Sequence, residues 1–563
     1  MHFLRAGRRR LALVLPLVSS CSAQRAARAP ADAPAGLARA ESLYADLREI
    51  RDRYEVSVAS ARRTTPEGVP LAVAARGHDS LLGRARSALT FIDSLSLGPD
   101  DRRALDRMRK ALGGELTPIA DIEPSEAHAS QPDCAYDPVR VAAGPDQIES
   151  LRTRLYACYG WAQSHVAAGP DTTDRLTVLG LVGRTPDPTR RRELFLALEP
   201  VWRSVNRGNE PESPYRRLIE LEAARRAGGE PASAAQARAS GVSPDSLERW
   251  LVAMLEAWRD GTPDSLIEPW DWYYDVGRAG RELAGRVPLD RLPAINAEVY
   301  RALGADLDSV GVRYDLAPRP GKTPVAFCTF GRRARLRAGR WRPGEPWVFA
   351  TYRAGGLDNL NELLHETGHA VHIAAIRTRP AFADWPDSDP FTEALAEFVA
   401  LDLYEPAWQL RWLGDSVPLP VGLRARYAGI VMDVAWAVFE MRMQRDPAAD
   451  PNEMWAAITR DYLRIRPHPE LSWWAMRGQL VDAPGYMMNY AAGAILIAAI
   501  RARTREVHGP FAPGDPSWYR WVATRLFRYG LERPTREVVE EFLGGPVTPR
   551  AVLEDMGRMK SGR

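Results

Sequence analysis

Histidine is rare in this chain of 563 residues, yet three of its nine histidines, His365, His369 and His372, fall within eight positions. The first two form the pattern His-Glu-x-x-His, with Glu366 between them. Residues four apart on a helix project from the same face, so these two imidazoles can share one zinc ion at about 2.0–2.1 Å. Glu366, next to the first ligand, can hold a water molecule at that ion and act as its general base.

A third protein ligand is needed. His372 lies about 10 Å along the helix axis from His365, too far to bind the same ion, so we expect it to pack beside the ligands or support them. A following apolar segment carries Glu393 and Glu397, spaced four apart. Buried carboxylates are costly unless they bind a metal or a charged partner. We predict that Glu393 is the ligand and that Glu397 accepts a ring N–H of a ligand histidine, with the reverse assignment left open.

Two helices beside a small sheet must position these residues. From about residue 38 the apolar residues recur with a period of 3.6, which predicts a large, mainly α-helical protein. Residues 357–378 and 390–404 are the helices that carry the cluster. Strand character is confined to residues 324–330 (PVAFCTF) and 346–352 (PWVFATY), which are rich in β-branched and aromatic residues.

The amino-terminal residues 1–20 are first basic, then apolar and then small, which is typical of a signal peptide. Ser-Ser-Cys21 resembles a bacterial lipoprotein box, in which Cys21 carries lipid and begins the mature chain; cleavage after Ala23 is the alternative. Residues 21–37, rich in Ala, Pro and Arg, are predicted to be a flexible linker. We therefore expect an exported protein, periplasmic or attached to the outer membrane only through that lipid.

The charge balance argues against a nucleic-acid-binding protein. The chain has 75 basic and 72 acidic residues, and loss of the four arginines in residues 1–20 takes the formal net charge from +3 to −1. Six arginines crowd between the two strands, from Arg332 to Arg342. We interpret them as a solvated hairpin loop, with acidic substrates or anionic lipid as the alternative contacts. Of the four cysteines, only Cys134 and Cys158 are close enough to pair.

Several segments resemble the zinc oligopeptidase family of thimet oligopeptidase and oligoendopeptidase F, which is related in fold to angiotensin-converting enzyme. They are the Trp-Asp-Trp-Tyr-Tyr sequence at 270–274, residues 315–328, residues 357–364, the 24 positions from His369 to Glu393, and the Gly-Tyr-Met-Met-Asn-Tyr-Ala-Ala-Gly sequence at 485–493. The resemblance implies a two-lobed helical zincin fold with a deep channel and a small β-sheet beside the active-site helix. The amino-terminal lobe would span residues 38–265 and the catalytic lobe residues 266–563.

The resemblance also implies further site residues. Tyr490, in preference to Tyr486, would donate a hydrogen bond to the oxyanion of the tetrahedral intermediate. An extended peptide would pair with the edge of one of the two predicted strands. That position would make Cys328 and Thr329 substrate-binding residues.

The chain departs from the family in two places. Thimet-type enzymes have a histidine shortly before the Gly-Tyr pair and a further tyrosine after it, and this chain has neither at those positions. His468 is the candidate to replace that histidine, with a plain loop residue as the alternative. Converting enzymes hold the substrate carboxylate with a lysine, but no lysine lies between Lys322 and Lys560, which leaves Arg477 for that role. This difference argues against dipeptidyl carboxypeptidase action and leaves peptide hydrolysis intact.

Together these residues predict a zinc-dependent metallopeptidase with one zinc ion per chain, acting as a monomer on short peptides. The alternative is a non-catalytic relative, a peptide-binding envelope lipoprotein that keeps the fold. Loss of Glu366 or of a ligand would indicate the alternative, but all four positions are present.

Overall fold

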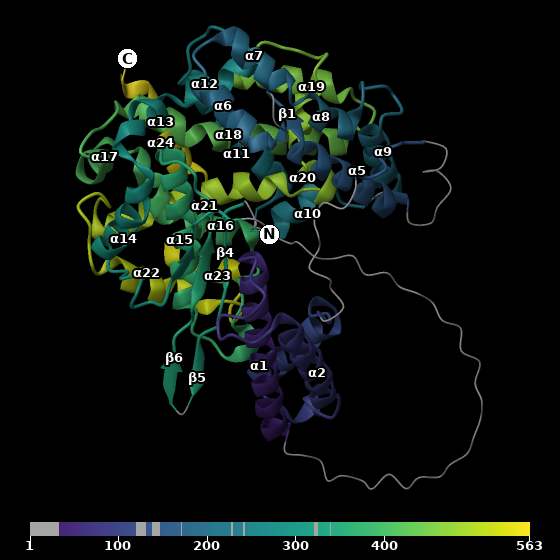
Figure 1. Cartoon of the computed structure of the whole chain (residues 1–563), viewed down its shortest axis with the longest axis vertical. Coiled ribbons are helices and arrows are strands. Elements are labelled where there is room, and N and C mark those ends of the chain that lie inside the picture. The colour runs from purple at the N-terminus through teal and green to yellow at the C-terminus, as the bar shows by residue number, and fades with distance from the viewer. Residues whose placement is uncertain are drawn as a thin grey trace.

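The computed structural model of the chain is mainly helical, as predicted (Figure 1). It describes residues 33–119, 131–137, 147–169, 172–226, 229–239, 242–319, 322, 325–337 and 339–562. The predicted signal peptide, with Cys21 and Ala23, lies outside the described residues. The helices, in chain order, are α1 (Ala33–Ala59), α2 (Leu71–Thr90), α3 (Pro99–Lys110), α5 (Gln147–Ser164), α6 (Arg175–Arg184), α7 (Pro188–Leu196), α8 (Glu199–Asn206), α9 (Pro214–Arg226), α10 (Ala232–Ala239), α11 (Pro244–Asp260), α12 (Trp272–Val276), α13 (Arg278–Glu282), α14 (Leu292–Ala302), α15 (Leu357–Ala375), α16 (Asp389–Ala400), α17 (Pro406–Leu413), α18 (Leu419–Arg445), α19 (Pro451–Ile458), α20 (Gln479–Asp482), α21 (Met487–His508), α22 (Trp518–Arg525), α23 (Thr535–Leu543) and α24 (Arg550–Gly557).

The predicted linker is too long at its carboxyl end, because α1 already begins at Ala33. Leu37 is 1% exposed and belongs to the same apolar cluster as Leu89 and Ile92. Pro34 is tolerated because it stands in the first turn of the helix, and the helix forms because its apolar side chains have a surface to cover. Residues 33–37 are therefore helix and not linker.

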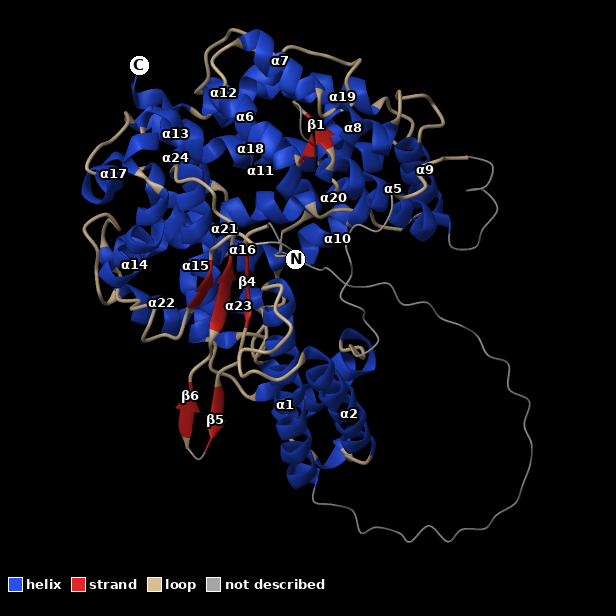
Figure 2. Cartoon of the chain, in the orientation of Figure 1, coloured by secondary structure: helices blue, strands red, loops and turns tan. Residues whose placement is uncertain are grey.

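The small sheet before the histidine helix has three strands in the order β3-β7-β4 (Figure 2). Strand β7 (Pro346–Phe349) is central, antiparallel to β4 (Phe327–Phe330) and parallel to β3 (Arg313–Asp315). The two predicted strands are present but shorter, and β3 was missed because three residues carry too little alternation to detect. Outside this sheet, β5 (Arg335–Arg337) pairs with β6 (Arg340–Arg342), and β1 (Val166–Ala167) pairs with β2 (Thr172–Thr173).

The apolar interior forms two large cores that do not follow the predicted boundary at residue 265. Helices α5 to α11 share one core with α18 to α21 and α24, although they lie on opposite sides of that boundary. Helices α13 to α17, the three-stranded sheet, α22 and α23 build the second core. Helix α21 contributes to both cores. Helices α1 to α3 pack with Ala381 and Phe382, from the carboxyl-terminal half, in a smaller cluster.

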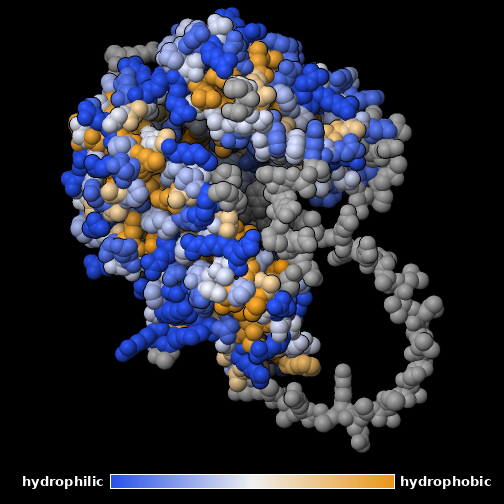
Figure 3. Space-filling view, in the orientation of Figure 1, coloured by the Kyte–Doolittle hydropathy of each residue, from blue (hydrophilic) through white to orange (hydrophobic). Residues whose placement is uncertain are grey.

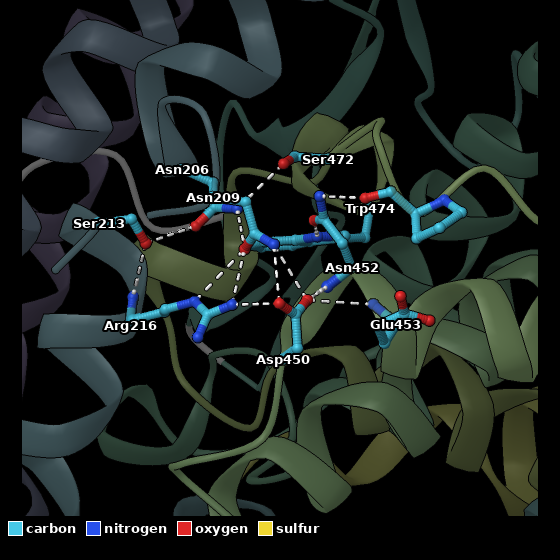
Figure 4. A network of polar contacts seen from close by, with 10 residues as sticks. Asn206, Asn209, Ser213, Arg216, Asp450, Asn452, Glu453, Ser472 and Trp474 are labelled. Atoms are coloured by element: carbon cyan, nitrogen blue, oxygen red, sulfur yellow. Dashed lines mark hydrogen bonds and ion pairs between the residues drawn. The ribbon is translucent and has the colours of Figure 1, made fainter. Parts of the chain in front are cut away.

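A polar network ties the loop between α8 and α9 to the segment around α19, more than 200 positions later (Figure 4). Asn209 donates from Nδ2 to both carboxylate oxygens of Asp450 at 3.0 Å, and Arg216 pairs with the same carboxylate. Asn206 donates to the hydroxyl of Ser472 at 3.0 Å. Asn209 adopts a φ of +66°, a left-handed conformation that asparagine tolerates better than most residues. The network joins the two sequence halves of the first core.

We expect Asp450→Ala to lower the free energy of unfolding by about 2–3 kcal/mol. Asp450 caps α19 by accepting from the backbone N–H groups of Asn452 and Glu453, and it also binds Asn209 and Arg216. Its removal leaves several donors without their acceptor. Equilibrium denaturant unfolding followed by circular dichroism measures the change.

Asp187→Ala is the matched control, because Asp187 also caps a helix but is exposed, and among the described residues its side chain accepts from the N–H of Thr189 alone. It should cost about 1 kcal/mol. Equal losses in the two variants would show that the network adds nothing to the helix cap.

Candidate metal centre

The helices that carry the histidines and the glutamates cross in close contact. A Cβ atom on Gly368 would lie 2.3 Å from the backbone oxygen of Ala396, so only glycine permits this approach of α15 to α16. His369 and Glu397 are the next residues along each helix. The close crossing therefore brings the side chains of the two predicted motifs together.

Local sequence determines where the two helices begin. Helix α15 follows Gly356, whose φ of +113° is a conformation that other residues rarely adopt. Helix α16 has Pro390 in its first turn, and the hydroxyl of Ser388 accepts from the N–H of Phe391.

The three predicted ligands lie together. His365 Nε2 is 3.5 Å and His369 Nε2 is 3.8 Å from Glu393 Oε2, and the three ligand atoms all lie within 4.8 Å of one another. Ligands of a tetrahedral zinc ion with bonds of 2.0–2.2 Å lie about 3.3 Å apart. The two imidazoles and one carboxylate therefore fit zinc in both donor type and spacing. Among the described residues this is the one such group of His, Cys, Asp or Glu side chains.

Glu397 lies on the other side of the first histidine. Its Oε1 is 3.0 Å from Nδ1 of His365, as expected for a carboxylate that accepts the ring N–H. With that proton on Nδ1, the Nε2 lone pair is free and faces Glu393. The geometry thus favours Glu393 as ligand over the reverse assignment.

The charges around the cluster favour metal-binding protonation states at His369 and Glu393 but not at His365. Burial lowers the pKa of His365, but the charge of Glu397 and the hydrogen bonds with Glu393 and Glu397 raise it well above its usual value, so a metal would have to displace that proton. Burial lowers the pKa of His369 to about 4, which keeps its ring neutral. Burial opposes ionisation of Glu393, but the hydrogen bond with His365 and the electrostatic influence of the two histidines lower its pKa to about 2. A neutral imidazole and an ionised carboxylate are the forms that bind zinc.

Glu366 is almost fully enclosed, with 6% of its surface exposed. Its Oε2 has no hydrogen-bond partner within the described part of the chain. Burial raises the pKa of Glu366 to about 8, with Glu393 acting in the same direction and His365 against it. A carboxyl group with a raised pKa beside a metal site is suited to accept and then return a proton near neutral pH.

Both candidate tyrosines stand at the start of α21, which packs along α16. Their rings lie 5.6 Å apart, and both side chains are half-buried. Burial raises the pKa of both hydroxyls, and the charge of Glu393 adds to the effect on each. Both hydroxyls therefore experience the charge of Glu393 and remain protonated donors.

Two acidic residues, neither of them predicted from the sequence, contact the tyrosine segment or the arginine beside it. Asp433 pairs with Arg477, whose guanidinium lies 5.8 Å from the ring centre of Tyr490. Glu440 accepts the N–H of Gly485 at 2.5 Å, just before α21. A signal was available: these are the two carboxylates, seven positions apart, in residues 427–441, a stretch of α18 with no other charged residue.

His372 packs but does not support the ligands. It is fully buried among Trp385, Phe391 and Phe527, and neither ring nitrogen has a hydrogen-bond partner among the described residues. Trp385 lies between the two histidines, 5.5 Å from the ring of His369 and 5.7 Å from that of His372. The predicted supporting role is therefore wrong, and the packing role holds.

His468 is not available to a substrate. Its Nδ1 lies 2.6 Å from Glu470 and its Nε2 2.8 Å from Glu268, and its ring packs against Trp270. Two carboxylates thus occupy both nitrogens. The prediction that His468 replaces the family's histidine in substrate binding is therefore wrong.

Of the two strands predicted from the sequence, one is available for peptide pairing. Strand β7 is paired on both sides, whereas β4 lies at one edge of the sheet, opposite β3 at the other edge. Thr329 is half-buried on one face of β4, whereas Cys328 is 5% exposed and points into the second core. The side chain of Cys328 therefore does not reach a peptide on that edge, although its backbone could.

Solved structures of other proteins have a similar fold. The sequence matches no protein-family model and no curated protein. The structure is similar to an M32 carboxypeptidase from Deinococcus radiodurans R1, with a TM-score of 0.53 and 15% identity over 94% of this chain and 100% of that chain. A structure assigned to oligoendopeptidase F matches with a TM-score of 0.53 and 15% identity, over 92% of this chain and 96% of that chain. The chain therefore has the mainly helical fold found in these two peptidase structures.

Proposed function

We propose that the chain is a zinc-dependent metallopeptidase that hydrolyses short peptides. The observation that carries the proposal is the meeting of His365, His369 and Glu393 on two crossing helices, with Glu366 enclosed beside them. The donor set and its spacing suit zinc. A shared fold alone would support a peptide-binding relative equally well, but such a protein has no need of all four groups.

The residues divide the chemistry of hydrolysis among them. A zinc ion held by the three ligands supplies Lewis acidity toward water and the scissile carbonyl. Glu366 takes the proton of the attacking water and returns it to the leaving amine, for which its raised pKa is suited. Tyr490 donates to the oxyanion that develops on the carbonyl.

The surroundings favour an extended peptide. Strand β4, which contacts α15, lies at one edge of the sheet, where a peptide backbone can add as a further strand. Arg477, beside Tyr490, can attract a substrate carboxylate, although Asp433 already offsets part of its charge. We propose short, unfolded peptides as substrates on this basis, and we propose that the enzyme acts as a monomer.

The disulfide between Cys134 and Cys158 supports the proposal of an exported enzyme. Such bonds persist in oxidising compartments such as the bacterial periplasm. We propose the periplasm or the outer membrane as the location, with attachment through a lipid on Cys21.

Glu366→Gln should lower kcat by about three orders of magnitude, because an amide cannot take the proton of the attacking water. Zinc content should stay at one ion per chain, because the substitution leaves the three candidate ligands in place and adds no charge beside them. Mass spectrometry of a digested peptide library and metal analysis of the purified protein check both parts. Equal cleavage by the two proteins would overturn the mechanism. One bound zinc with no cleavage of any peptide would instead indicate the peptide-binding alternative.

Glu393→Gln and Glu397→Gln should differ in zinc affinity. Loss of the ligand Glu393 should abolish stoichiometric binding, whereas loss of the Glu397 contact with His365 should weaken binding by about 10–100-fold. Competition with a chromophoric chelator measures both constants. The opposite order of effects would assign Glu397 as the ligand.

Tyr490→Phe should lower kcat by about 10²–10³-fold with little change in KM, because an oxyanion donor acts only in the transition state. Tyr486→Phe is the matched variant on the same helix turn and should have a much smaller effect. Steady-state kinetics on one cleaved peptide separates the two, and a larger effect at Tyr486 would reverse the assignment.

A further inference from the structure

The hairpin β5-β6 projects from the body of the molecule and has two unlike faces (Figure 2). Side chains alternate along a strand, so the cross-strand pair of Leu336 and Trp341 lies on one face and the arginines lie on the other. Leu336 is 55% and Trp341 39% exposed. An apolar pair of this kind has no packing role in the described fold.

The arginine face is held against α1, which corrects the interpretation of this segment as a solvated loop. Arg335 pairs with Asp46 at 2.5 Å and Arg342 with Glu49 at 3.0 Å. These ion pairs lie at the base of the hairpin. They orient it along α1 and direct the apolar pair away from the protein.

The tip of the hairpin carries charge that the protein does not neutralise. Arg337 is mostly exposed and reaches Asp46 only at 3.9 Å. Arg340, its cross-strand neighbour, is exposed and has no ion pair within the described part of the chain. Figure 3 shows the hairpin as a hydrophilic arm at the lower left.

A second exposed apolar site lies at the same end of the molecule. Phe91 and Leu95, in the turn after α2, are 86% and 88% exposed. Ile92, between them, packs 3.7 Å from the position of a Cβ on Gly36, in the first turn of α1. The hairpin and this turn therefore both flank the amino-terminal half of α1.

The chain enters the described fold at this end. Only twelve positions separate Ala33 from Cys21, a reach of at most about 40 Å when fully extended. A lipid on Cys21 would hold this end of the molecule close to a membrane. None of the described helices combines the length and the apolar content that a membrane span requires.

We propose that this end, formed by the tip of β5-β6 and the turn at Phe91 and Leu95, rests on the surface of an anionic lipid bilayer. Trp341 and Leu336 enter the headgroup region, where indole rings are favoured, and Phe91 and Leu95 make a second apolar contact. Arg337 and Arg340 bind lipid phosphates. This inference concerns where the molecule sits and does not depend on the proposed peptidase activity.

The test uses residues 24–563, a chain that lacks Cys21 and keeps every described residue, so any membrane binding comes from the folded protein. Sedimentation with vesicles of phosphatidylcholine containing about one third phosphatidylglycerol should deplete the protein from solution at low salt. Vesicles of phosphatidylcholine alone should bind it far less, and raised salt should release it. Absence of binding to the anionic vesicles would overturn the proposal.

Variants identify the surface. The double substitution Leu336→Ser with Trp341→Ser, and separately Phe91→Ser with Leu95→Ser, should each lower the partition coefficient by about fivefold or more. Arg340→Glu should lower it by about tenfold, because a charge attracted to the surface becomes one that is repelled. All these positions are exposed, and circular dichroism confirms that each variant remains folded.

Matched controls lie elsewhere on the surface. Leu410→Ser removes an exposed apolar side chain, 58% accessible, from α17, and Arg225→Glu reverses an exposed charge on α9. Both should bind the anionic vesicles as the unchanged protein does. If the controls and the hairpin variants lost vesicle binding equally, the binding would not depend on this surface, and the assignment would be overturned.

Discussion

The close approach of α15 and α16 at Gly368 is the constraint on which the candidate metal centre depends. Two candidate ligands come from one helix and the third from the other, so the distance between the helix axes sets the distance from Glu393 to the histidines. Metal–ligand bonds tolerate deviations of only about 0.2 Å. A side chain at residue 368 would separate the helices by far more than that, since its Cβ alone would overlap the oxygen of Ala396. The glycine inside the histidine motif is therefore as much a part of the site as the ligands.

The same need for close contact explains why so much charge is buried around the centre. The candidate tyrosines belong to a segment at the edge of the first core, whereas α15 and α16 belong to the second, and α21 contributes to both. Apolar packing alone does not orient one core against another with enough accuracy for catalysis. Directional polar contacts do so: Glu440 accepts from Gly485 before α21, and Arg501, further along that helix, pairs with Asp402 after α16. Burial raises the pKa of Glu440 to about 8, although the backbone hydrogen bonds from Gly485 and Met487 act in the opposite direction.

Sequence patterns predicted most of the centre because its chemistry is local. The positions of His365, Glu366 and His369 follow from helix periodicity, and the axial distance from His365 separated His372 from the candidate ligands, whose group does not include it. Periodicity could show that Glu393 and Glu397 share a face, but only the position of each oxygen relative to the two ring nitrogens could distinguish their roles. Contacts over long sequence distances were not predictable in the same way. Glu268, 200 positions earlier, hydrogen-bonds His468, and no sequence pattern links the two residues. The division of the chain at residue 265 failed for the same reason, because α18 returns to pack with α11.

The arginine segment shows how a composition argument can hide a pattern. The count of six arginines alone indicates a solvated loop. In the two strands, however, arginine alternates with an apolar residue, so the arginines lie on one face of the hairpin and Leu336 and Trp341 on the other. The complementary signal lies far away, in Asp46, Glu49 and Asp52 of α1, whose spacing of three places all of them on one side of the helix. Arg335, Arg342 and Arg333 pair with these three acids in turn. A nearly neutral net charge is therefore compatible with strong local sorting, in which paired arginines attach the hairpin to α1 and the remaining ones, at its tip, face outward.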